Sequence, residues 1–421
     1  MDILFLSHYF PPEGNAPASR VSELCRRWVA AGHSVRVITG VPNVPNGVIY
    51  DSYRNRLWQW EAWQGVQVLR VWTYLATNSG TVRRTLNYLS FMVSSFLAGL
   101  CVRRPDVVLA TSPQFFCGWA GALTAWFRCR PFILEIRDIW PESIEAVGAV
   151  KNRMAIQALG WLEQRLYRSA HRIVTVGAGY RSRLIQRGVS SEKIDIVMNG
   201  VDRQLFLPDT SPARVRAEFG LDGKFVCAYV GTVGMASGLD ILLRAGRALR
   251  DQGNLEVVFL VVGDGAVAAD LKRQARELGL SNVVFVCRQP KERIPEFIAA
   301  ADVCLVHLKA QALFESVMPS KIFEALALAR PVILGVRGFA AEFLETTGGG
   351  LCIEPENARQ LNEAVQRLRD NPELARQFGT NGQRYVLERF DRDSLAADYL
   401  AIIKAVCGQA PGIAATQAVR R

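Results

Sequence analysis

The sequence contains few of the patterns that would identify a metalloprotein or a disulfide-stabilised secreted domain. Its 421 residues include only four scattered histidines, and no His-Glu-x-x-His motif occurs. The nine cysteines form no Cys-x-x-Cys pair, which argues against a zinc ribbon and against a thioredoxin-like redox motif. The N-terminus lacks the basic start and the cleavage site of a signal peptide, so we expect a cytoplasmic protein whose cysteines are reduced and buried.

The composition is that of an ordinary folded protein. Hydrophobic residues make up 50% and charged residues 21% of the chain, which excludes wholesale disorder. Glycine and proline are not enriched, so collagen-like and low-complexity segments are also excluded. At roughly 100–200 residues per domain, the length predicts two or three domains.

Short apolar runs alternate with helix-length segments along the whole chain. In the first half, the runs expected to form strands are Ile3–Leu6, Val35–Thr39, Val66–Val71, Val107–Ala110, Phe132–Ile136 and Ile173–Val176. After a pause near Asn199–Pro208, the pattern restarts with Phe225–Val230, Val257–Val262, Val283–Val286, Val303–Val306 and Val332–Leu334. This repetition predicts an α/β protein with two facing, doubly wound, Rossmann-like domains and a cleft between them.

Positive charge is concentrated in the first half of the chain. Residues 1–200 contain 23 basic and 13 acidic residues, so they carry +10 of the formal net charge of +11. An anionic partner is therefore expected, and the lack of zinc-finger, RRM or basic-zipper patterns favours a membrane surface over nucleic acid. The tryptophans Trp58, Trp60, Trp63 and Trp72, also in this half, fit that interpretation.

The uncharged stretch Thr85–Val102 is bounded by Arg83–Arg84 and Arg103–Arg104 and is rich in leucine and phenylalanine. It has 18 residues, some of them polar, and it lies between two expected strands of one sheet, so a membrane-spanning helix is disfavoured. Two alternatives stay open: a buried crossover helix, or a helix that lies in the membrane interface.

Two loops at the expected carboxyl ends of strands in the first half have unusual residues. The loop that starts at His8 and contains Gly14 opens a helix, but it has neither a Gly-x-Gly-x-x-Gly nor a P-loop motif. The loop after Phe132–Ile136 contains Arg137, Asp138, Trp140 and Glu142. A sheet core would not contain these side chains, so they indicate a site. The alternative for the Gly14 loop is a proline-rich turn, and the alternative for the second loop is an Arg–Asp pair that closes it.

The second half has glycine-rich loops after its expected strands, and exposed amides in such loops could hold a diphosphate. The loop residues are Gly231, Thr232, Gly234 and Ser237 after the first strand, and Gly263 and Asp264 after the second. Lys321 lies in the first turn of a later helix, where the helix dipole disfavours a cation unless an anion is nearby. Glu324 follows on the same face, so this pair would fit the phosphate and the ribose of a nucleotide sugar; the alternative is a surface Lys–Glu pair.

Taken together, these motifs resemble those of one enzyme family. The Gly14 loop, Asn199-Gly-Val-Asp202 with Phe206, the Gly231 loop and Pro319-Ser-Lys-Ile-Phe-Glu324 are similar to those of GT-B retaining glycosyltransferases of family four, the glycosyl transferases group 1. The His8 loop and Arg137-Asp-Ile-Trp-Pro-Glu-Ser143 resemble more closely the WbuB-like branch, which is associated with L-fucosamine-type transfer. The resemblance covers essentially the whole chain.

The resemblance implies a retaining, metal-independent enzyme without a cofactor. It would move an N-acetylated deoxyhexosamine from a UDP-sugar to a polyprenyl-diphosphate-linked saccharide in bacterial O-antigen, capsule or exopolysaccharide assembly. We expect an acceptor-binding, membrane-proximal domain over residues 1–203 and a nucleotide-sugar-binding domain over 204–385. Residues 386–408 would form a helix that packs back on the first domain, and 409–421 a flexible tail. The enzyme would lie on the anionic inner leaflet of the cell membrane and bind no nucleic acid.

The residues that match functional positions of the family fall into three groups. Catalytic roles are implied for Asp138, Arg137, Lys321, Glu315 and Ser316. Binding of the nucleotide sugar is implied for Gly14, Gly231, Thr232, Gly234, Ser237, Gly263, Asp264, Arg288, Ser320, Lys321 and Glu324. Binding of the acceptor is implied for His8, Asn15, Ser112, Trp140 and Glu142.

The sequence departs from the wider family at several of these positions. Thr232 and Ser237 stand where the family has an arginine and a lysine that contact the diphosphate, so Lys321 and Arg137 would have to supply that charge. A histidine is also frequent in the family at the position of Arg137. The first member of the family's acidic pair falls at Ser316, next to a glutamate.

Two other functions are compatible with the same residues. One is a UDP-sugar 2-epimerase of the same fold, which would need no acceptor. The other is a non-catalytic membrane-surface or nucleic-acid binding protein with a decayed nucleotide pocket. The acidic pair Asp391-Arg-Asp393 does not indicate a metal site, because acidic residues at a helix start are explained by the helix dipole.

Overall fold

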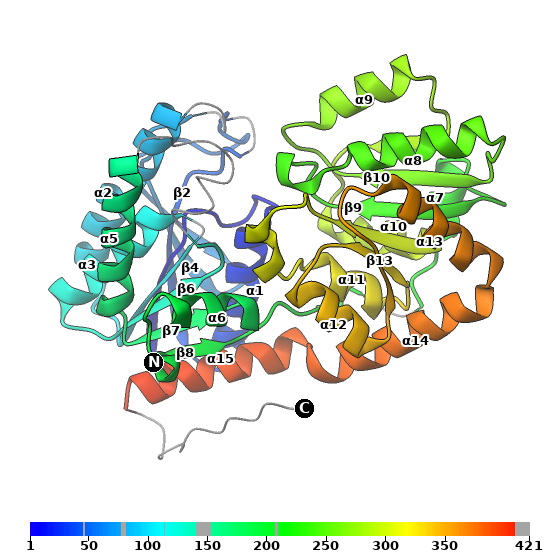
Figure 1. Cartoon of the computed structure of the whole chain (residues 1–421). Helices are drawn as coiled ribbons and strands as arrows, with labels where there is room; N and C mark the ends of the chain where they lie inside the picture. The colour runs from blue at the N-terminus through cyan, green and yellow to red at the C-terminus, as the bar shows by residue number, and fades with distance from the viewer. Residues whose placement is uncertain (45–46, 77–80, 113, 140–152, 207–208, 409–421) are drawn as a thin grey trace. The chain divides into compact units, whose positions relative to one another are not determined.

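The chain folds into two compact units (Figure 1). The computed structural model describes residues 1–44, 47–76, 81–112, 114–139, 153–206 and 209–408. Unit 1 comprises Met1–Met198 and the chain from Asp393 onward, and unit 2 comprises Asn199–Arg392.

Unit 1 is built on an eight-stranded sheet in the order β3-β4-β2-β1-β5-β6-β7-β8. The strands are β1 (Asp2–Leu6), β2 (Ser34–Gly40), β3 (Trp58–Trp63), β4 (Val66–Val71), β5 (Val107–Thr111), β6 (Phe132–Ile136), β7 (Arg172–Thr175) and β8 (Ile194–Ile196). The helices are α1 (Ala16–Ala30), α2 (Thr81–Cys101), α3 (Phe115–Arg128), α5 (Arg153–Ser169), α6 (Ala178–Gln186) and α15 (Arg392–Val406). All neighbouring strands are parallel except β3 and β4.

The antiparallel edge strand β3 was not among the expected strands. It pairs with β4 through the two-residue turn Gln64-Gly65, in which both residues have positive φ angles of 47° and 82°. Turns of this kind suit the twist of a hairpin and usually contain Asn-Gly or Asp-Gly. Because glutamine stands where asparagine or aspartate is usual, the sequence did not indicate a turn here. The tryptophans of β3 were interpreted only as residues suited to a membrane surface.

The core of unit 1 contains residues from both ends of the chain. On one face of the sheet, α1 packs against α15, and the indole ring of Trp28 lies 5.3 Å from the ring of Tyr399. The indole N–H of Trp28 donates to the carbonyl oxygen of Ala396 at 3.0 Å. Figure 1 shows α2, α3 and α5 on the other side of the sheet from α1.

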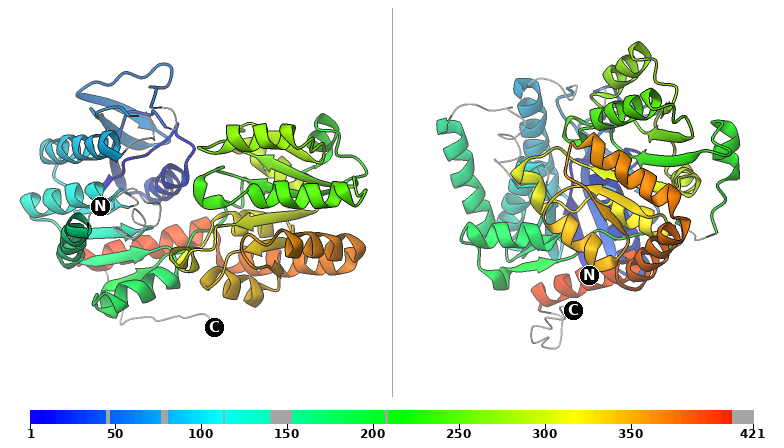
Figure 2. Two further views of the ribbon diagram at one scale, coloured as in Figure 1. Left: turned by 45° about the horizontal axis from the view of Figure 1, so that its top comes forward. Right: turned by 45° about the vertical axis from the view of Figure 1, so that its right-hand side comes forward.

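Unit 2 is built on a six-stranded parallel sheet in the order β11-β10-β9-β12-β13-β14. Its strands are β9 (Phe225–Val230), β10 (Val257–Val262), β11 (Val283–Val286), β12 (Val303–His307), β13 (Val332–Gly335) and β14 (Gly350–Cys352). Its helices are α7 (Ala213–Glu218), α8 (Asp240–Asp251), α9 (Ala268–Glu277), α10 (Ile294–Ala300), α11 (Lys321–Ala327), α12 (Phe339–Thr347), α13 (Ala358–Asp370) and α14 (Pro372–Arg389). Both views in Figure 2 show helices on either side of this sheet.

Each sheet has a topological switch point, where the order of the strands reverses direction. In unit 1 the switch lies between β1 and β5, and in unit 2 it lies between β9 and β12. Ligands of doubly wound sheets bind outside the carboxyl ends of the strands at such a point. The predicted fold class, with two Rossmann-like α/β domains, is confirmed, and the topology directs attention to the loops after these strands.

Helix α2 contains all but the last residue of the uncharged stretch Thr85–Val102 and connects β4 to β5, so it is a crossover helix. Phe91, Ser95 and Ala98 face inward and are buried, whereas an outer stripe that includes Val93 and Leu97 is exposed. The helix is therefore not a fully buried one. Within the described residues, no helix is both long enough and apolar enough to cross a membrane.

The expectation that the cysteines are buried is correct for only part of them. Those buried in the described structure are Cys25, Cys117, Cys227 and Cys304. Those exposed are Cys101, Cys129, Cys287 and Cys352. Three of the four buried cysteines lie within a strand or on the inward face of α1. The exposed cysteines lie at or directly after the end of a helix or strand. Composition alone does not reveal these positions.

Candidate functional site

The glycine-rich loops after β9 and β10 lie against each other at the carboxyl end of the unit 2 sheet. Gly231 and Gly263 have φ angles of 140° and 145°, which favour glycine. A Cβ atom on Gly263 would lie only 1.9 Å from the carbonyl oxygen of Gly231. The amide of Gly231 also donates to Val262 at 2.8 Å, and that of Val233 to Asp264 at 3.0 Å. These contacts require glycine and place both loops beside the switch point.

Lys321, the first residue of α11, lies directly against this pair of loops. Its Nζ atom is 3.6 Å from the centroid of the Tyr229 ring, a cation–π contact. The same atom would lie 2.8 Å from a Cβ atom on Gly231. Within the described residues, no carboxylate forms an ion pair with Lys321. Its positive charge is therefore available to an anion at the glycine-rich loop, and the expected phosphate contact stays a prediction.

Glu324 lies one helical turn beyond Lys321 and is half-buried, with 23% of its side chain exposed. Burial raises the pKa of its carboxyl group above the usual range, and the positive charges of Arg392, Lys291 and Lys321 oppose that rise. Arg392 Nη2 is 3.8 Å from Glu324 Oε1. The group is thus a carboxylate surrounded by cations, and it can accept hydrogen bonds from hydroxyl groups.

Arg392 is a site residue that the sequence analysis missed. Its Nε atom donates to the carbonyl oxygen of Gly200 at 2.9 Å, and its amide donates to Val201 at 3.0 Å. Both crossings of the chain between the units, at Asn199 and at Arg392, therefore lie side by side and next to Glu324. The only sequence signal was a basic residue between two aspartates.

Ser237 stabilises the glycine-rich loop from within. Its hydroxyl donates to the carbonyl oxygen of Thr232 at 3.1 Å and accepts from the Tyr229 hydroxyl at 3.0 Å. The carbonyl oxygen of Ser237 in turn lies 2.7 Å from Nδ1 of the buried His307. The Thr232 side chain is not part of this network. The expected phosphate contacts of Thr232 and Ser237 stay predictions. The Ser237 hydroxyl already forms hydrogen bonds within the loop.

His307, at the end of β12, was also missed by the sequence analysis. The amide of Glu356 donates to His307 Nε2 at 2.8 Å, so Nε2 is an acceptor and the proton resides on Nδ1. Burial lowers the pKa of this histidine, which keeps the ring neutral and fixed in one tautomer. The ring thereby joins the glycine-rich loop to the segment after β14.

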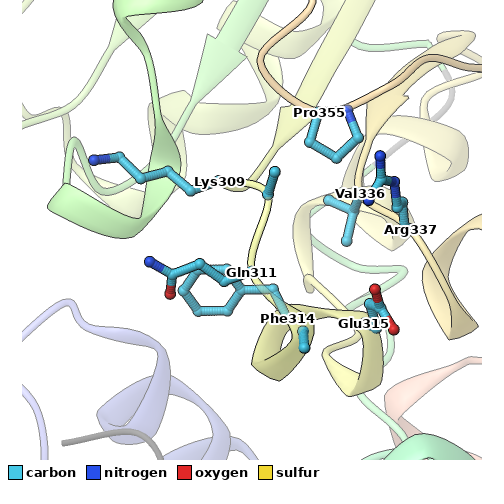
Figure 3. A pocket seen from close by; sticks show the side chains of 9 residues that line it. Lys309, Gln311, Phe314, Glu315, Val336, Arg337 and Pro355 are labelled. Atoms are coloured by element: carbon cyan, nitrogen blue, oxygen red, sulfur yellow. The ribbon is translucent and has the colours of Figure 1, made fainter. Parts of the chain in front are cut away.

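Glu315 and Ser316 precede α11 and have different surroundings. Glu315 is exposed and lines a cavity of about 50 Å³ together with Lys309 and Arg337 (Figure 3). Ser316 is buried, and its hydroxyl donates to the carbonyl oxygen of Leu313 at 3.0 Å. The glutamate is therefore the better placed of the two to meet a ligand, whereas Arg337 of the same cavity is paired with Glu354 at 2.5 Å.

The remaining expected donor residues lie around the same sheet edge. Ser320 is half-buried and directly precedes α11. Asp264 is exposed, and its Oδ1 atom accepts from the amide of Gly265 at 2.8 Å. Gly234 precedes a single turn of 3₁₀ helix in the β9 loop. Arg288 is exposed after β11. All four residues thus lie in loops that follow a strand of unit 2 or directly before α11.

In unit 1, Ser112 joins the ends of two neighbouring strands. Its Oγ atom accepts from the amides of Arg137 at 2.9 Å and Asp138 at 3.3 Å. Ser112 follows β5, and the other two residues follow β6. The structure therefore brings together these three predicted residues, which the sequence had placed on separate loops.

Arg137 has a guanidinium group that is partly out of water. Burial lowers its pKa to about 10, although the nearby Glu135 carboxylate acts in the opposite direction. Within the described residues, its Nε and Nη1 atoms are buried and have no hydrogen-bond partner. Glu135 is instead paired with Arg20 at 2.7 Å. A buried cation with free donors can hold an anionic or hydroxyl-rich ligand at the end of β6.

The predicted residues of the β1 loop have packing and capping contacts within unit 1. His8 is buried, and its ring packs edge-on against Phe91 at 4.5 Å and Tyr88 at 5.6 Å. Burial lowers its pKa to about 3, so the ring is neutral. Asn15 caps α1 through Oδ1, which accepts from Ala18 at 2.9 Å, while Gly14 is exposed. Trp140 and Glu142 lie outside the described residues, so their expected acceptor contacts stay predictions.

Glu13 is a buried carboxyl group that the sequence analysis did not single out. Its Oε1 atom accepts from the amides of Asn43 at 3.0 Å and Val44 at 3.1 Å, which joins the β1 loop to the loop after β2. Burial raises its pKa from 4.5 to about 7, against the effect of these two amides.

We expect Glu13→Gln to change how stability depends on pH. Because the folded-state pKa is raised, the stability that the neutral carboxyl group contributes is complete below pH 4.5 and is lost as pH rises through about 7. The wild type should therefore lose roughly 3 kcal/mol relative to the variant over this range. Urea unfolding of both proteins at several pH values measures the difference, and parallel stability curves would contradict the assignment.

Comparisons with known proteins agree with this arrangement. The profile of the family Glycosyl transferases group 1 matches residues 213–385, and that of the Glycosyl transferase 4-like domain matches residues 15–200. The two matches cover most of both units and contain the two groups of site residues from Ser112 to Glu324.

The chain belongs to the group 1 glycosyltransferases.

One relative is a protein of Escherichia coli K12 named as a colanic acid biosynthesis glycosyl transferase, WcaI. It is 26% identical over 416 residues, which cover 96% of this glycosyltransferase and 100% of the relative. Sucrose-phosphate synthase from Thermosynechococcus elongatus shares the fold with a TM-score of 0.75 and 19% identity, covering 97% and 99% of the two chains. HepE from Anabaena, solved with UDP and glucose, has a TM-score of 0.71 and 20% identity, covering 96% and 100%.

Each unit of the glycosyltransferase thus has its own group of candidate site residues. In unit 2, the glycine-rich loops, Lys321 and Glu324 can hold phosphate and hydroxyl groups. In unit 1, Ser112, Arg137 and Asp138 can hold a second ligand. In the described part of the chain, no cluster of three or more His, Cys, Asp or Glu residues could hold a metal ion.

Proposed function

We propose that this glycosyltransferase moves an N-acetylated deoxyhexosamine, with retention, from a UDP-sugar to a saccharide linked to polyprenyl diphosphate. The product would enter bacterial O-antigen, capsule or exopolysaccharide. The observation that carries the proposal is the position of the Lys321 ammonium group against the Gly231 loop, with Glu324 one turn beyond. UDP in the HepE structure and the colanic acid role in the name of WcaI support the choice of donor and pathway class.

The proposed donor site divides the nucleotide sugar among three groups. Lys321 and the amides of the Gly231 loop bind the diphosphate, and Glu324 accepts hydrogen bonds from the ribose hydroxyls. Glu315, beside the cavity of Figure 3, contacts the donor sugar, with Ser316 behind it. Positive charge on the leaving diphosphate is expected to be the main catalytic contribution, because charge develops there as the glycosidic bond breaks.

The proposed reaction is a front-face displacement. The bond between the anomeric carbon and the diphosphate oxygen breaks, and the acceptor oxygen bonds to the same face of that carbon. The leaving UDP accepts the proton of the acceptor hydroxyl. Arg137 and Asp138 orient the acceptor from unit 1, and the unpartnered Nε and Nη1 atoms of Arg137 are suited to an acceptor phosphate or hydroxyl.

The resemblance of the His8 and Arg137 motifs to the WbuB-like branch supports an L-fucosamine-type donor. The lipid-linked acceptor also requires the enzyme to reach a bilayer, so we propose peripheral association with the anionic inner leaflet. The excess of basic residues in the first half of the chain supports that location.

A screen of UDP-sugars against a short polyprenyl-diphosphate saccharide, followed by mass spectrometry, tests the proposal. One UDP-sugar should give a product heavier by one sugar residue, in the presence of EDTA and only when the acceptor is present. Conversion of the UDP-sugar without acceptor would support the epimerase instead. Titration calorimetry with UDP that gives no heat would support a non-catalytic binding protein.

A further inference from the structure

Three aromatic side chains form an exposed corner where the last turns of α2 and α3 meet. Trp126 and Phe127 are 72% and 56% exposed, and their ring centroids are 4.7 Å apart. Phe96 of α2 reaches the same place, with its ring 5.4 Å from that of Phe127. We call these three residues the aromatic corner. Large apolar side chains gathered on a surface in this way usually mark a site of interaction.

The aromatic corner is held in place by hydrogen bonds from Arg128. Its Nη1 and Nη2 atoms donate to the carbonyl oxygens of Leu100 at 2.8 Å and Val102 at 2.7 Å, which are at the end of α2. Arg104 donates to the carbonyl oxygen of Arg128 at 3.2 Å. The ends of both helices are therefore joined, so little ordering is needed when a partner covers the rings.

Positive charge surrounds the aromatic corner. Arg103 has 85% of its side chain exposed, and its nearest carboxylate, that of Asp2, is 3.6 Å away and also paired with Arg36. Helices α2 and α3 contain no acidic residue at all. The single acidic residue of α5, Glu163, is buried and forms an ion pair with Arg187. A partner that covers this face is expected to be apolar and anionic.

The apolar surface extends beyond the corner on both sides. Along α2, the exposed stripe includes Val93 and Leu97. On α5, Trp161 is exposed, and the guanidinium group of Arg165 lies 4.6 Å above its ring. The three helices lie side by side on one face of the unit 1 sheet in both Figure 1 and Figure 2.

We propose that the aromatic corner is the part of the protein that inserts into an anionic lipid bilayer. Aromatic rings prefer the interfacial region of a membrane, and arginines beside them bind anionic head groups. The proposal rests on the proposed function, which brings the enzyme to a lipid-linked acceptor. It differs from the expectation for Thr85–Val102, because the insertion is made by the end of α3 and by Phe96 rather than by the length of α2.

Flotation with vesicles tests the proposal. The full-length wild type should float with vesicles that contain roughly 30% anionic phosphatidylglycerol in phosphatidylcholine. A smaller fraction of the protein should float with vesicles of pure phosphatidylcholine. The double variant Trp126→Ser/Phe127→Ser should bind the anionic vesicles at least about tenfold more weakly. The matched control is Trp58→Ser/Trp60→Ser, which removes two exposed tryptophans of β3 in the same unit and should bind as the wild type does.

Several results would overturn the proposal. These are a wild type that does not float, a corner variant that floats like the wild type, and equal losses in the corner variant and the control. Size-exclusion chromatography that shows a wild-type dimer and a monomeric corner variant would assign the corner to self-association instead. Circular dichroism and the thermal unfolding midpoint of each variant, compared with those of the wild type, check that the variants are folded.

Activity separates this proposal from the proposed function. Transfer to a water-soluble short-chain acceptor should be unchanged in Trp126→Ser/Phe127→Ser, whereas transfer to an acceptor embedded in vesicles should fall in parallel with flotation. A wild type that floats through the corner but transfers no sugar would contradict the proposed function alone. Normal transfer with unchanged flotation of the variant would contradict the membrane corner alone.

Discussion

Lys321→Ala should lower kcat/KM by about 100-fold or more, because the ammonium group lies where negative charge develops on the leaving diphosphate. Its Nζ atom is held over the Tyr229 ring and against Gly231. Within the described residues it has no carboxylate partner that would neutralise it. Most of the loss should therefore appear in kcat, since stabilisation of the leaving group acts in the transition state. Steady-state kinetics with the preferred UDP-sugar measure it.

A lysine on α9 provides the control for this prediction. Lys272→Ala removes an equal charge from a half-buried position on α9 of unit 2 and should leave kcat/KM within about twofold, the range of a surface change. Near-normal turnover of Lys321→Ala would transfer the phosphate role to the loop amides or to Arg137. A variant that loses UDP affinity and kcat/KM equally would indicate ground-state binding rather than catalysis.

Glu324→Ala should weaken UDP binding by roughly 10- to 150-fold, because two ribose hydroxyls lose a charged acceptor contributing about 1.5–3 kcal/mol. The effect should also depend on pH. Since the pKa of Glu324 is raised by burial, the wild-type carboxylate becomes protonated at a higher pH than an ordinary glutamate does. UDP affinity of the wild type should therefore fall on acidification, while Glu324→Gln should lack this dependence. Calorimetry across pH measures both.

Two variants sharpen the test of Glu324. Glu345→Ala removes an exposed carboxylate from α12 and should bind UDP like the wild type. Arg392→Met removes the cation 3.8 Å from Glu324 and should raise the pH at which affinity begins to fall, because one of the charges that oppose protonation is lost. UDP affinity that is unchanged in folded Glu324→Ala would exclude the ribose role.

The sequence was sufficient to predict the strands whose residues are apolar over their whole length. Strands buried on both faces, such as β9 and β10, consist almost entirely of apolar residues and were predicted with their observed bounds. The edge strands β3 and β14 were missed because half or more of their residues are partly exposed. These strands are stabilised by pairing with a neighbouring strand, and the residues of the strand itself do not reveal that pairing.

The candidate site was predictable where a residue type conflicts with its local position. Lys321 at the start of a helix and Arg137 at the end of a strand are such conflicts, and the proposed ligand contacts would explain both. His307, Glu13 and Arg392 gave no such signal. Their roles depend on partners 70, 30 and 192 residues away in the chain, respectively, and only the folded structure reveals those contacts.

The position of α15 affects the order in which the protein can fold during synthesis. Tyr399, Leu400 and Ile403 of this helix complete the core around Trp28, yet the ribosome makes them only after the whole of unit 2. At about 5–20 residues per second, residues 199–391 take roughly 10–40 s to synthesise after the strands of unit 1 are complete. During that interval the part of the α1 face of the sheet that α15 later covers is open to solvent. Until α15 has been made, the nascent first unit exposes apolar surface of the kind that holding chaperones bind, whereas unit 2 is one continuous segment and needs no later residue to close its core.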